Sequence, residues 1–338
     1  MAKILAAILN TDPQIMVVGT AKDGVEAVGL AEKLKPNLIT MDIHMPRMDG
    51  LEATKQIMAY FPTPILILSA SVHRVEHGVD KVFTALSYGA LDVMEKKAFM
   101  GDEIDEQAKI ELLEKIKLLA RIRVISHPLA KIEKGQLGPM AKNKTPVTSN
   151  SGKAVGIVAS TGGPQALSKM LKALPEKFSA PVFLVQHLPN GFVQGFADWL
   201  KQEVPLQVKV AEAGEKAQAG IIYLAPNDKH LKVGAGGILL LSHEAPVGFQ
   251  RPSGDLLLQS IAEVYGANAM GIVLTGMGSD GAQGLKKIHD SKGFTLAQDE
   301  ATSIVYGMPK VALELGGVDE IVPLLLIPEK IKNWVQSS

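Results

Sequence analysis

Short apolar runs alternate with amphipathic helical segments over most of the chain, and this alternation is the feature that most limits its fold. A first series consists of "QIMVVGTA", "NLITMD", "TPILILSAS" and "ALDVMEK", each followed or preceded by a helical pattern. A second series contains "KAVGIVAS", "PVFLVQH", "GIIYLAP", "GILLLSH", "MGIVLTG" and "GFTLAQD". Strands that alternate with helices predict parallel sheets covered by helices, so we expect an α/β protein.

A polar segment separates the two series. The stretch "KNKTPVTSNSG" is rich in Ser, Thr and Pro and shows no apolar periodicity, which is typical of a linker. The length of 338 residues is enough for two domains. We therefore expect a first domain at residues 1–124, a linker at 125–152 and a second domain at 153–338.

Composition excludes several classes of protein. The 35 Lys and Arg residues balance the 35 Asp and Glu residues, so no net field would recruit nucleic acid or an anionic membrane surface. The absence of Cys excludes disulfides, thiolate metal sites and cysteine nucleophiles. No apolar run approaches the ~20 residues that a membrane span needs. We expect a cytoplasmic protein that neither binds nucleic acid nor inserts into membranes.

Three polar residues stand at the ends of successive strands in the first series. Asp42 ends "NLITMD", Ser69 lies near the end of the next run, and Lys96 ends the third. The carboxyl ends of parallel strands form a ligand site, and a carboxylate there can act as an acyl-phosphate nucleophile. A single Asp in such a place would more simply be a helix cap. The three together favour a phosphate-accepting site.

The motif "DIHMPRMDGLEA", with Ser69 and Lys96 at the appropriate spacing, resembles the receiver domain of two-component response regulators. The resemblance implies a flavodoxin-like fold and phosphorylation of Asp42 by a sensor histidine kinase, with Mg²⁺ required. Ser69 and Lys96 would contact the phosphoryl group. The sequence departs from the family at Val93, where an aromatic residue is common, and at Lys97, where proline is usual. The acidic pair that holds Mg²⁺ at the end of the family's first strand is not found, so we assign no metal ligands.

The segment "KILAAIL" at the start of the chain is predicted to be a helix. Only "NTDPQ" joins it to "IMVVGTA", whereas parallel strands need a crossover of a dozen or more residues. We therefore expect an N-terminally truncated receiver domain that lacks its first strand. That strand is central in the 2-1-3-4-5 order of this fold. The strands expected at about 15–21 and 37–42 would then close up or leave an open edge.

The second series carries a different set of residues at its strand ends. Ser160 lies in the strand-turn-helix segment "GIVASTGGPQ", His187 ends "PVFLVQH", and Asp280 lies in "TGMGSDG". Taken singly, the serine could cap a helix, the histidine could be an ordinary core or surface residue, and the aspartate could belong to a turn. Taken together they can form a nucleophile, a general base and a group that orients the imidazole.

Six motifs in this half resemble the catalytic domain of the chemotaxis protein-glutamate methylesterases: "ASTGGP", "QHLPNGF", "YLAP", "RPSGD", "GIVLTGMGSDG" and "AQDEATSIVYGMP". The resemblance implies a doubly wound parallel-sheet serine hydrolase that cleaves glutamate γ-methyl esters on chemoreceptors and also deamidates receptor glutamines, in chemotaxis adaptation. Ser160, His187 and Asp280 would form the triad. Thr161 and Met277 would lie at the oxyanion, and the ester step would need no cofactor.

The sequence is compatible with three interpretations of function. The chain is an esterase controlled by phosphorylation of its receiver, an always partly active esterase with a disabled receiver, or a non-catalytic scaffold that binds chemoreceptors or the chemotaxis histidine kinase. "RPSGD" and "QDEATS" could be ordinary helix caps, so we leave them out of the catalytic residues. His44, His73 and His230 lack the spacing of metal ligands.

Overall fold

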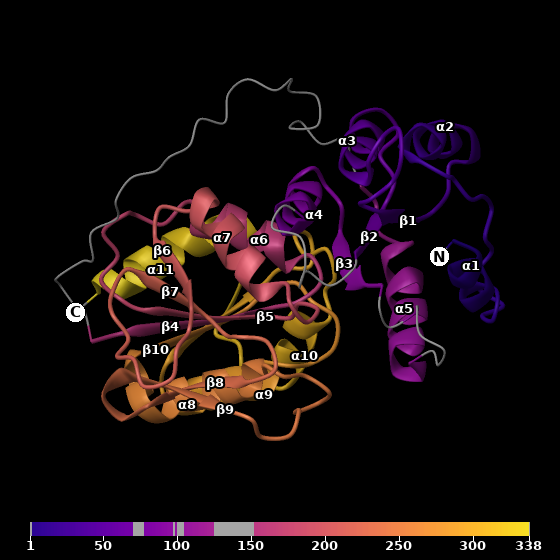
Figure 1. Cartoon of the computed structure of the whole chain (residues 1–338). Coiled ribbons are helices and arrows are strands. Elements are labelled where there is room, and N and C mark those ends of the chain that lie inside the picture. The colour runs from indigo at the N-terminus through magenta and orange to yellow at the C-terminus, as the bar shows by residue number, and fades with distance from the viewer. Residues whose placement is uncertain (1, 70–77, 97–98, 100–104, 125–151, 338) are drawn as a thin grey trace. The chain divides into compact units, whose positions relative to one another are not determined.

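The structure is a computed structural model that describes residues 2–69, 78–96, 99, 105–124 and 152–337. The chain divides into two compact units, Met1–Leu137 and Gly138–Ser338, drawn in Figure 1. Nearly all of the predicted linker, together with His73 and Lys97, lies outside the described residues.

The first unit contains a parallel sheet of order β1-β2-β3 among its described residues. Its strands are β1 (Ile39–Asp42), β2 (Ile65–Ser69) and β3 (Asp92–Glu95), and its helices are α1 (Ala2–Leu9), α2 (Gly24–Leu34), α3 (Gly50–Tyr60), α4 (Gly78–Ser87) and α5 (Glu106–Leu119). Every residue of β2 is buried, as expected for a parallel strand covered on both faces. A buried ion pair from Lys115 to Asp92, 2.9 Å long, fastens α5 to β3.

The predicted N-terminal helix is confirmed, because α1 buries Leu5, Ile8 and Leu9. The strand expected at about residues 15–21 is wrong. This segment has no regular secondary structure, Met16 is 79% exposed, and the segment lines a cavity of about 1360 Å³ beside β1. A strand needs a partner for its backbone N–H and C=O groups. Among the described residues β1 pairs with β2 alone, so the other edge of β1 stays open.

The second unit is built on a seven-stranded sheet of order β12-β11-β10-β4-β5-β7-β6, in which all pairs are parallel. The strands are β4 (Ala154–Ala159), β5 (Val182–Gln186), β6 (Gln207–Val210), β7 (Ile221–Leu224), β10 (Ala269–Val273), β11 (Phe294–Gln298) and β12 (Glu320–Val322). The three central strands are buried along their whole length, which explains their unbroken apolar runs.

Helices cover both faces of this sheet (Figure 1). One face carries α6 (Gly163–Leu171), α7 (Val193–Glu203) and α11 (Ile327–Gln336), and the other carries α8 (Gly254–Tyr265), α9 (Ala282–Asp290) and α10 (Met308–Glu314). The predicted doubly wound α/β architecture is therefore confirmed.

Outside the sheet, β8 (His230–Gly234) and β9 (Ile238–Ser242) form an antiparallel hairpin that packs on α8. The apolar run "GILLLSH" thus belongs to a hairpin rather than to the parallel sheet. Short 3₁₀ turns occur at Ala235–Gly237, Gly266–Asn268 and Leu324–Leu326. Among the described residues, no helix is long and apolar enough to cross a bilayer.

Candidate active site

The three residues predicted to form a triad meet at the carboxyl edge of the seven-stranded sheet. Ser160 directly follows β4, His187 directly follows β5, and Asp280 lies in the loop after β10. Because β10 and β5 flank β4, these three strand ends are neighbours. This is the edge at which open α/β sheets bind their ligands.

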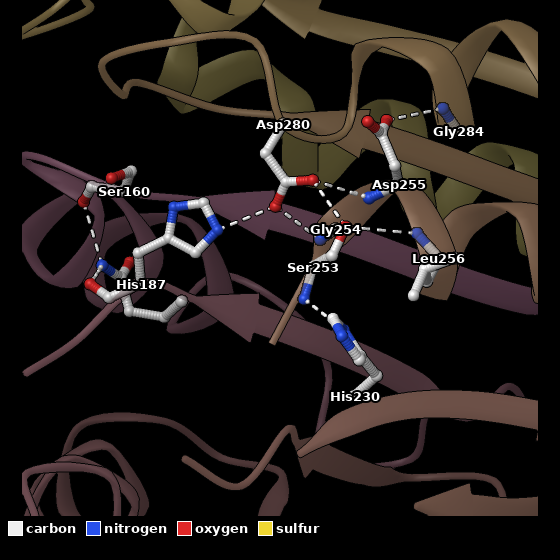
Figure 2. A network of polar contacts seen from close by, with 10 residues as sticks. Ser160, His187, His230, Ser253, Gly254, Asp255, Leu256, Asp280 and Gly284 are labelled. Carbon is white, nitrogen blue, oxygen red and sulfur yellow. Dashed lines mark hydrogen bonds and ion pairs between the residues drawn. The ribbon is translucent and has the colours of Figure 1, made fainter. Parts of the chain in front are cut away.

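His187 and Asp280 are joined directly. His187 Nε2 lies 2.8 Å from Asp280 Oδ2, and both side chains are about nine-tenths buried. Figure 2 shows the imidazole between Ser160 and Asp280, with its other nitrogen on the Ser160 side. That nitrogen, Nδ1, is buried and has no hydrogen-bond partner among the described residues. We assign the proton to Nε2, because a carboxylate can only accept, and Nδ1 then carries a lone pair suited to a general base.

Asp280 accepts four hydrogen bonds from described residues (Figure 2). Oδ2 accepts from His187 Nε2 and, at 2.6 Å, from the Gly254 N–H. Oδ1 accepts from Ser253 Oγ at 2.8 Å and from the Asp255 N–H at 3.0 Å. Burial alone would raise the pKa of Asp280, but the hydrogen bond and charge of His187, with the two backbone N–H groups, hold that pKa below its usual range. The carboxylate is therefore ionised, as the orienting group of a triad requires.

Three of these four donors come from the start of α8. Ser253 is the N-cap, and its Oγ accepts the Leu256 N–H at 3.5 Å. Gly254 allows the turn to approach β4, since a Cβ there would lie 2.3 Å from Val158 Cγ1. The motif "RPSGD" is thus a helix cap, as the sequence allows, and it also holds Asp280. Sequence reasoning missed this second role, because 27 residues separate Ser253 from Asp280.

The neighbouring Asp255 fastens α8 to α9. Its Oδ1 accepts the Gly284 N–H at 2.8 Å. Burial, followed by the nearby charge of Asp280, raises the pKa of Asp255 above its ordinary value. At Gly284 a Cβ would lie 2.8 Å from the Asp255 carbonyl oxygen, so the two helices touch through backbone. This close packing fixes the turn that holds Asp280.

Ser160 occupies the tight turn between β4 and α6. Its N–H donates to the Thr275 carbonyl at 3.1 Å, and its carbonyl accepts the Gly163 N–H at 2.8 Å. Gly162, the N-cap of α6, has φ +77°, a conformation that favours glycine. The turn thereby presents the serine hydroxyl beside the N-terminus of a helix.

Of the two residues predicted at the oxyanion, Thr161 lies in this turn and Met277 lies in the loop after β10. Thr161 is buried, and its carbonyl accepts a hydrogen bond from Thr275 Oγ1 at 2.9 Å. Met277 follows Gly276, where a Cβ would lie 2.8 Å from the Cβ of Ser160. The loop that carries Met277 therefore runs directly against the nucleophile, as an oxyanion donor would need to do.

Gln186 is a further site residue that sequence reasoning missed. Its Nε2 donates to the carbonyls of Ser160 and His187, both at 2.9 Å, from a side chain that is 3% exposed. The carboxamide therefore ties the backbone of the nucleophile to that of the base. As the last residue of an apolar strand, it carries no sequence signal of this role.

The first unit brings its own predicted residues together. Lys96 Nζ forms an ion pair with Asp42 Oδ2, and the Lys96 N–H donates to the Ser69 carbonyl at 2.8 Å. The other oxygen of Asp42 accepts the His44 N–H at 2.9 Å. Asp42, Ser69 and Lys96 thus meet at the carboxyl edge of the small sheet.

These residues do not fit a magnesium site. Within the described parts of the chain, no group of three or more His, Cys, Asp or Glu side chains could hold a metal ion. Mg²⁺ demands near-octahedral oxygen coordination, but Asp42 offers a single carboxylate that is already bonded to Lys96 and His44. We therefore derive no step through Mg²⁺ here.

Comparison with protein families follows the same division of the chain. Residues 155–331, just over half of the chain, match the family model described as CheB methylesterase. The chain belongs to the CheB methylesterase family. Residues 1–108 match the model described as response regulator receiver domain. The predicted family, and its pairing of a receiver with a methylesterase domain, are both confirmed.

Relatives in the CheB methylesterase family match nearly the whole chain. A protein-glutamate methylesterase/protein-glutamine glutaminase of Pyrococcus horikoshii is 39% identical over 339 residues, covering 99% of this chain and 91% of the relative. A Myxococcus xanthus protein of the same description, numbered 4, is 42% identical and covers 99% and 94%. The crystal structure of the Thermotoga maritima CheB methylesterase catalytic domain is 39% identical, with a TM-score of 0.53, and covers 54% of this chain and 97% of that one.

Proposed function

We propose that the chain hydrolyses glutamate γ-methyl esters on chemoreceptors and releases methanol, in chemotaxis adaptation. We also propose that it deamidates receptor glutamines, since its relatives are described as both methylesterases and glutaminases. One observation carries the proposal: His187 lies between Ser160 and Asp280, bound to the carboxylate through Nε2, and no described residue bonds its Nδ1. This is the arrangement that a serine nucleophile, a base and an orienting carboxylate require.

In the proposed mechanism, Ser160 Oγ attacks the ester carbonyl while His187 Nδ1 takes the hydroxyl proton. Asp280 stabilises the imidazolium that forms. The tetrahedral intermediate collapses, and His187 returns the proton to the leaving methoxide, which departs as methanol. Water, deprotonated by His187, then cleaves the acyl-serine to give glutamate and free Ser160. With a glutamine substrate the leaving group is ammonia.

Backbone groups would hold the negative oxygen of the tetrahedral intermediate. We assign this role to the N–H of Met277, together with Thr161, because Thr161 directly follows Ser160 and Gly276, which precedes Met277, packs against Ser160. The positive end of α6 adds to the stabilisation, since its first turn begins two residues after Thr161. Such donors act strongly when they are fixed before the reaction starts.

Replacing Ser160 with alanine tests the esterase. The Ser160→Ala chain is expected to fold normally, because Ser160 Oγ makes no hydrogen bond to any described residue, and to lose at least about 10⁴-fold in turnover. The assay is methanol release from an enzymatically methylated chemoreceptor fragment. Wild-type turnover in the variant would refute Ser160 as nucleophile, whereas methanol release by the unmodified chain would exclude the scaffold alternative.

We propose Asp42 as the phosphate acceptor of a chemotaxis-type histidine kinase, with Ser69 and Lys96 as contacts of the phosphoryl group. The support is the convergence of these three residues at one sheet edge. The test is incubation with acetyl phosphate, with and without Mg²⁺, followed by mass spectrometry and methanol release, with Asp42→Asn as control. Phosphorylation of Asp42 with faster hydrolysis would support control by the receiver. An unmodified Asp42 in both conditions would favour the alternative of a disabled receiver.

A further inference from the structure

We propose that Ser253 is a positioning residue of the active site, which acts on the reaction through Asp280 and His187. The proposal rests on the function proposed above. It assigns to the first residue of the α8 cap a role in aligning the general base, in addition to its role in starting the helix. Figure 2 shows Ser253 beside the Asp280 carboxylate, on the side away from Ser160.

The contact between Ser253 and Asp280 is direct and buried. Ser253 is fully buried, and its Oγ donates to Asp280 Oδ1 at 2.8 Å. Of the four described donors to Asp280, Gly254 and Asp255 use backbone N–H groups. The two side-chain donors among these four are therefore Ser253 and His187. The Ser253 hydroxyl binds Oδ1, and the His187 imidazole binds Oδ2.

The backbone N–H of Ser253 is in turn hydrogen-bonded to a buried histidine, His230. The Ser253 N–H donates to His230 Nδ1 at 3.1 Å, and His230 Nε2 lies 3.2 Å from the Ala245 carbonyl. His230 is fully buried, and a nitrogen that accepts an N–H bond must be unprotonated. This fixes His230 as the neutral tautomer with its proton on Nε2. A continuous series of hydrogen bonds thus runs from the β8–β9 hairpin through Ser253 to Asp280 and His187.

Removing the Ser253 hydroxyl would disturb the base through Asp280. Asp280 would lose the donor that fixes Oδ1, so the carboxylate could rotate and the hydrogen bond that orients the His187 imidazole would weaken. The other titratable groups at this place are Asp255 on α8 and His230 on β8. Both are bonded through backbone N–H groups, which a change of the Ser253 side chain leaves in place.

A purely structural role for Ser253 makes a different prediction. As an N-cap it also accepts the Leu256 N–H, and a serine cap replaced by alanine weakens a helix, whereas glycine is nearly as good a cap as serine. The backbone at Ser253, with φ −104° and ψ 130°, is open to both replacements. If the hydroxyl only caps the helix, Ser253→Gly keeps full activity and Ser253→Ala loses some. If it positions Asp280, Ser253→Gly loses activity as well, and Ser253→Ala loses at least as much.

Ser260 offers a matched control on the same helix. Its buried hydroxyl accepts the Val233 N–H at 2.9 Å and donates to the Leu257 carbonyl at 2.7 Å. Ser260→Ala therefore removes a buried hydroxyl and two hydrogen bonds from α8 without touching Asp280. A general disturbance of α8 would affect this variant at least as much as Ser253→Gly.

The experiment measures kcat and KM for methanol release by the full chain on a methylated chemoreceptor fragment over a range of pH. Ser253→Gly and Ser253→Ala are expected to lower kcat by about 10- to 100-fold with KM changed less than about twofold, the effect of losing one hydrogen bond to a charged group. The pH profile of kcat is expected to differ from that of wild type, because the hydrogen bond that orients His187 is weakened. Ser260→Ala should stay close to wild type.

A second readout does not depend on activity. The ¹H–¹⁵N imidazole signals of His187 should shift in Ser253→Gly and Ser253→Ala and stay in place in Ser260→Ala. The proposal is overturned if Ser253→Gly keeps the wild-type kcat profile and the wild-type His187 signals, or if Ser260→Ala causes the same changes as Ser253→Gly. An unmodified chain that released no methanol would refute the proposed function instead, and the imidazole signals would still decide the role of Ser253.

Discussion

Replacing Asp280 with asparagine should destabilise the second unit as well as stop the reaction. The carboxylate accepts two hydrogen bonds at each oxygen. An asparagine amide has one oxygen and one NH₂ group, so its NH₂ must face two of the four donors in either orientation. One of these two is a backbone N–H that cannot turn away, from Gly254 at one position or from Asp255 at the other.

The size of the effect follows from these contacts. A buried donor left without an acceptor costs about 1–3 kcal/mol, and each remaining bond loses about 1 kcal/mol when its acceptor becomes neutral. The expected loss in the free energy of unfolding is therefore on the order of 3–5 kcal/mol. Turnover should fall by about 10⁴-fold as well, because the amide no longer selects the required tautomer of His187.

Urea unfolding followed by tryptophan fluorescence measures this loss. Both tryptophans of the chain, Trp199 and Trp334, lie in the second unit, so the signal reports that unit by itself. Ser160→Ala is the matched control, because it should stop turnover without changing the unfolding midpoint. If Asp280→Asn unfolds within about 0.5 kcal/mol of wild type, the four hydrogen bonds do not depend on the carboxylate, and the reasoning about this site fails.

Two further predictions concern pH and backbone contact. The pKa of Asp280 is lowered in the folded chain from 3.8, so the stability that its charge provides is complete above that value and is lost as the pH falls through the lower folded pKa. The stability gap between wild type and Asp280→Asn should therefore narrow as the pH falls below 3.8, and a gap at about pH 3 equal to that at about pH 5 in urea titrations would contradict this. Gly50→Ala should destabilise the first unit by about 3 kcal/mol or more, since its Cβ would lie 1.9 Å from the Asp42 carbonyl oxygen. Gly29→Ala, at an exposed position of α2, should instead stabilise the first unit by about 0.5–1 kcal/mol, because a Cβ there meets nothing within 4 Å. Hydrogen exchange of α3 and α2 would measure both changes, and equal protection in the two variants would refute the contact argument.

The buried centre of each sheet was predictable from sequence, because strands covered on both faces need unbroken apolar runs. The edges were not. β6 and β12 are short and partly exposed, so their apolar pattern is weak. The run "GILLLSH" is apolar enough for a central strand, but its place in a hairpin depends on β8, which the sequence did not single out. The apolar run "QIMVVGTA" also predicted a strand at about residues 15–21, although a strand forms only where a partner accepts its hydrogen bonds.

The candidate site likewise contains some residues that could be predicted from the sequence and others that could not. Ser160, His187 and Asp280 could be predicted because each follows a recognisable apolar strand. Ser253 and Gln186 could not, since one looks like an ordinary helix cap and the other like the end of a strand. Their importance depends on contacts across the sheet edge, between segments that lie far apart in the chain.

The order of the three central strands has a consequence for how activity is gained during folding. His187 and Asp280 are 93 residues apart in the chain and follow β5 and β10, the strands on either side of β4. Their hydrogen bond can form only after both flanking strands have paired with β4. Such non-local pairings form slowly, because distant segments must come together, at a cost in chain entropy, before any contact between them stabilises the chain. Regain of hydrolysis during refolding therefore follows assembly of the sheet centre rather than formation of the helices, and it marks one of the last events in folding of the unit.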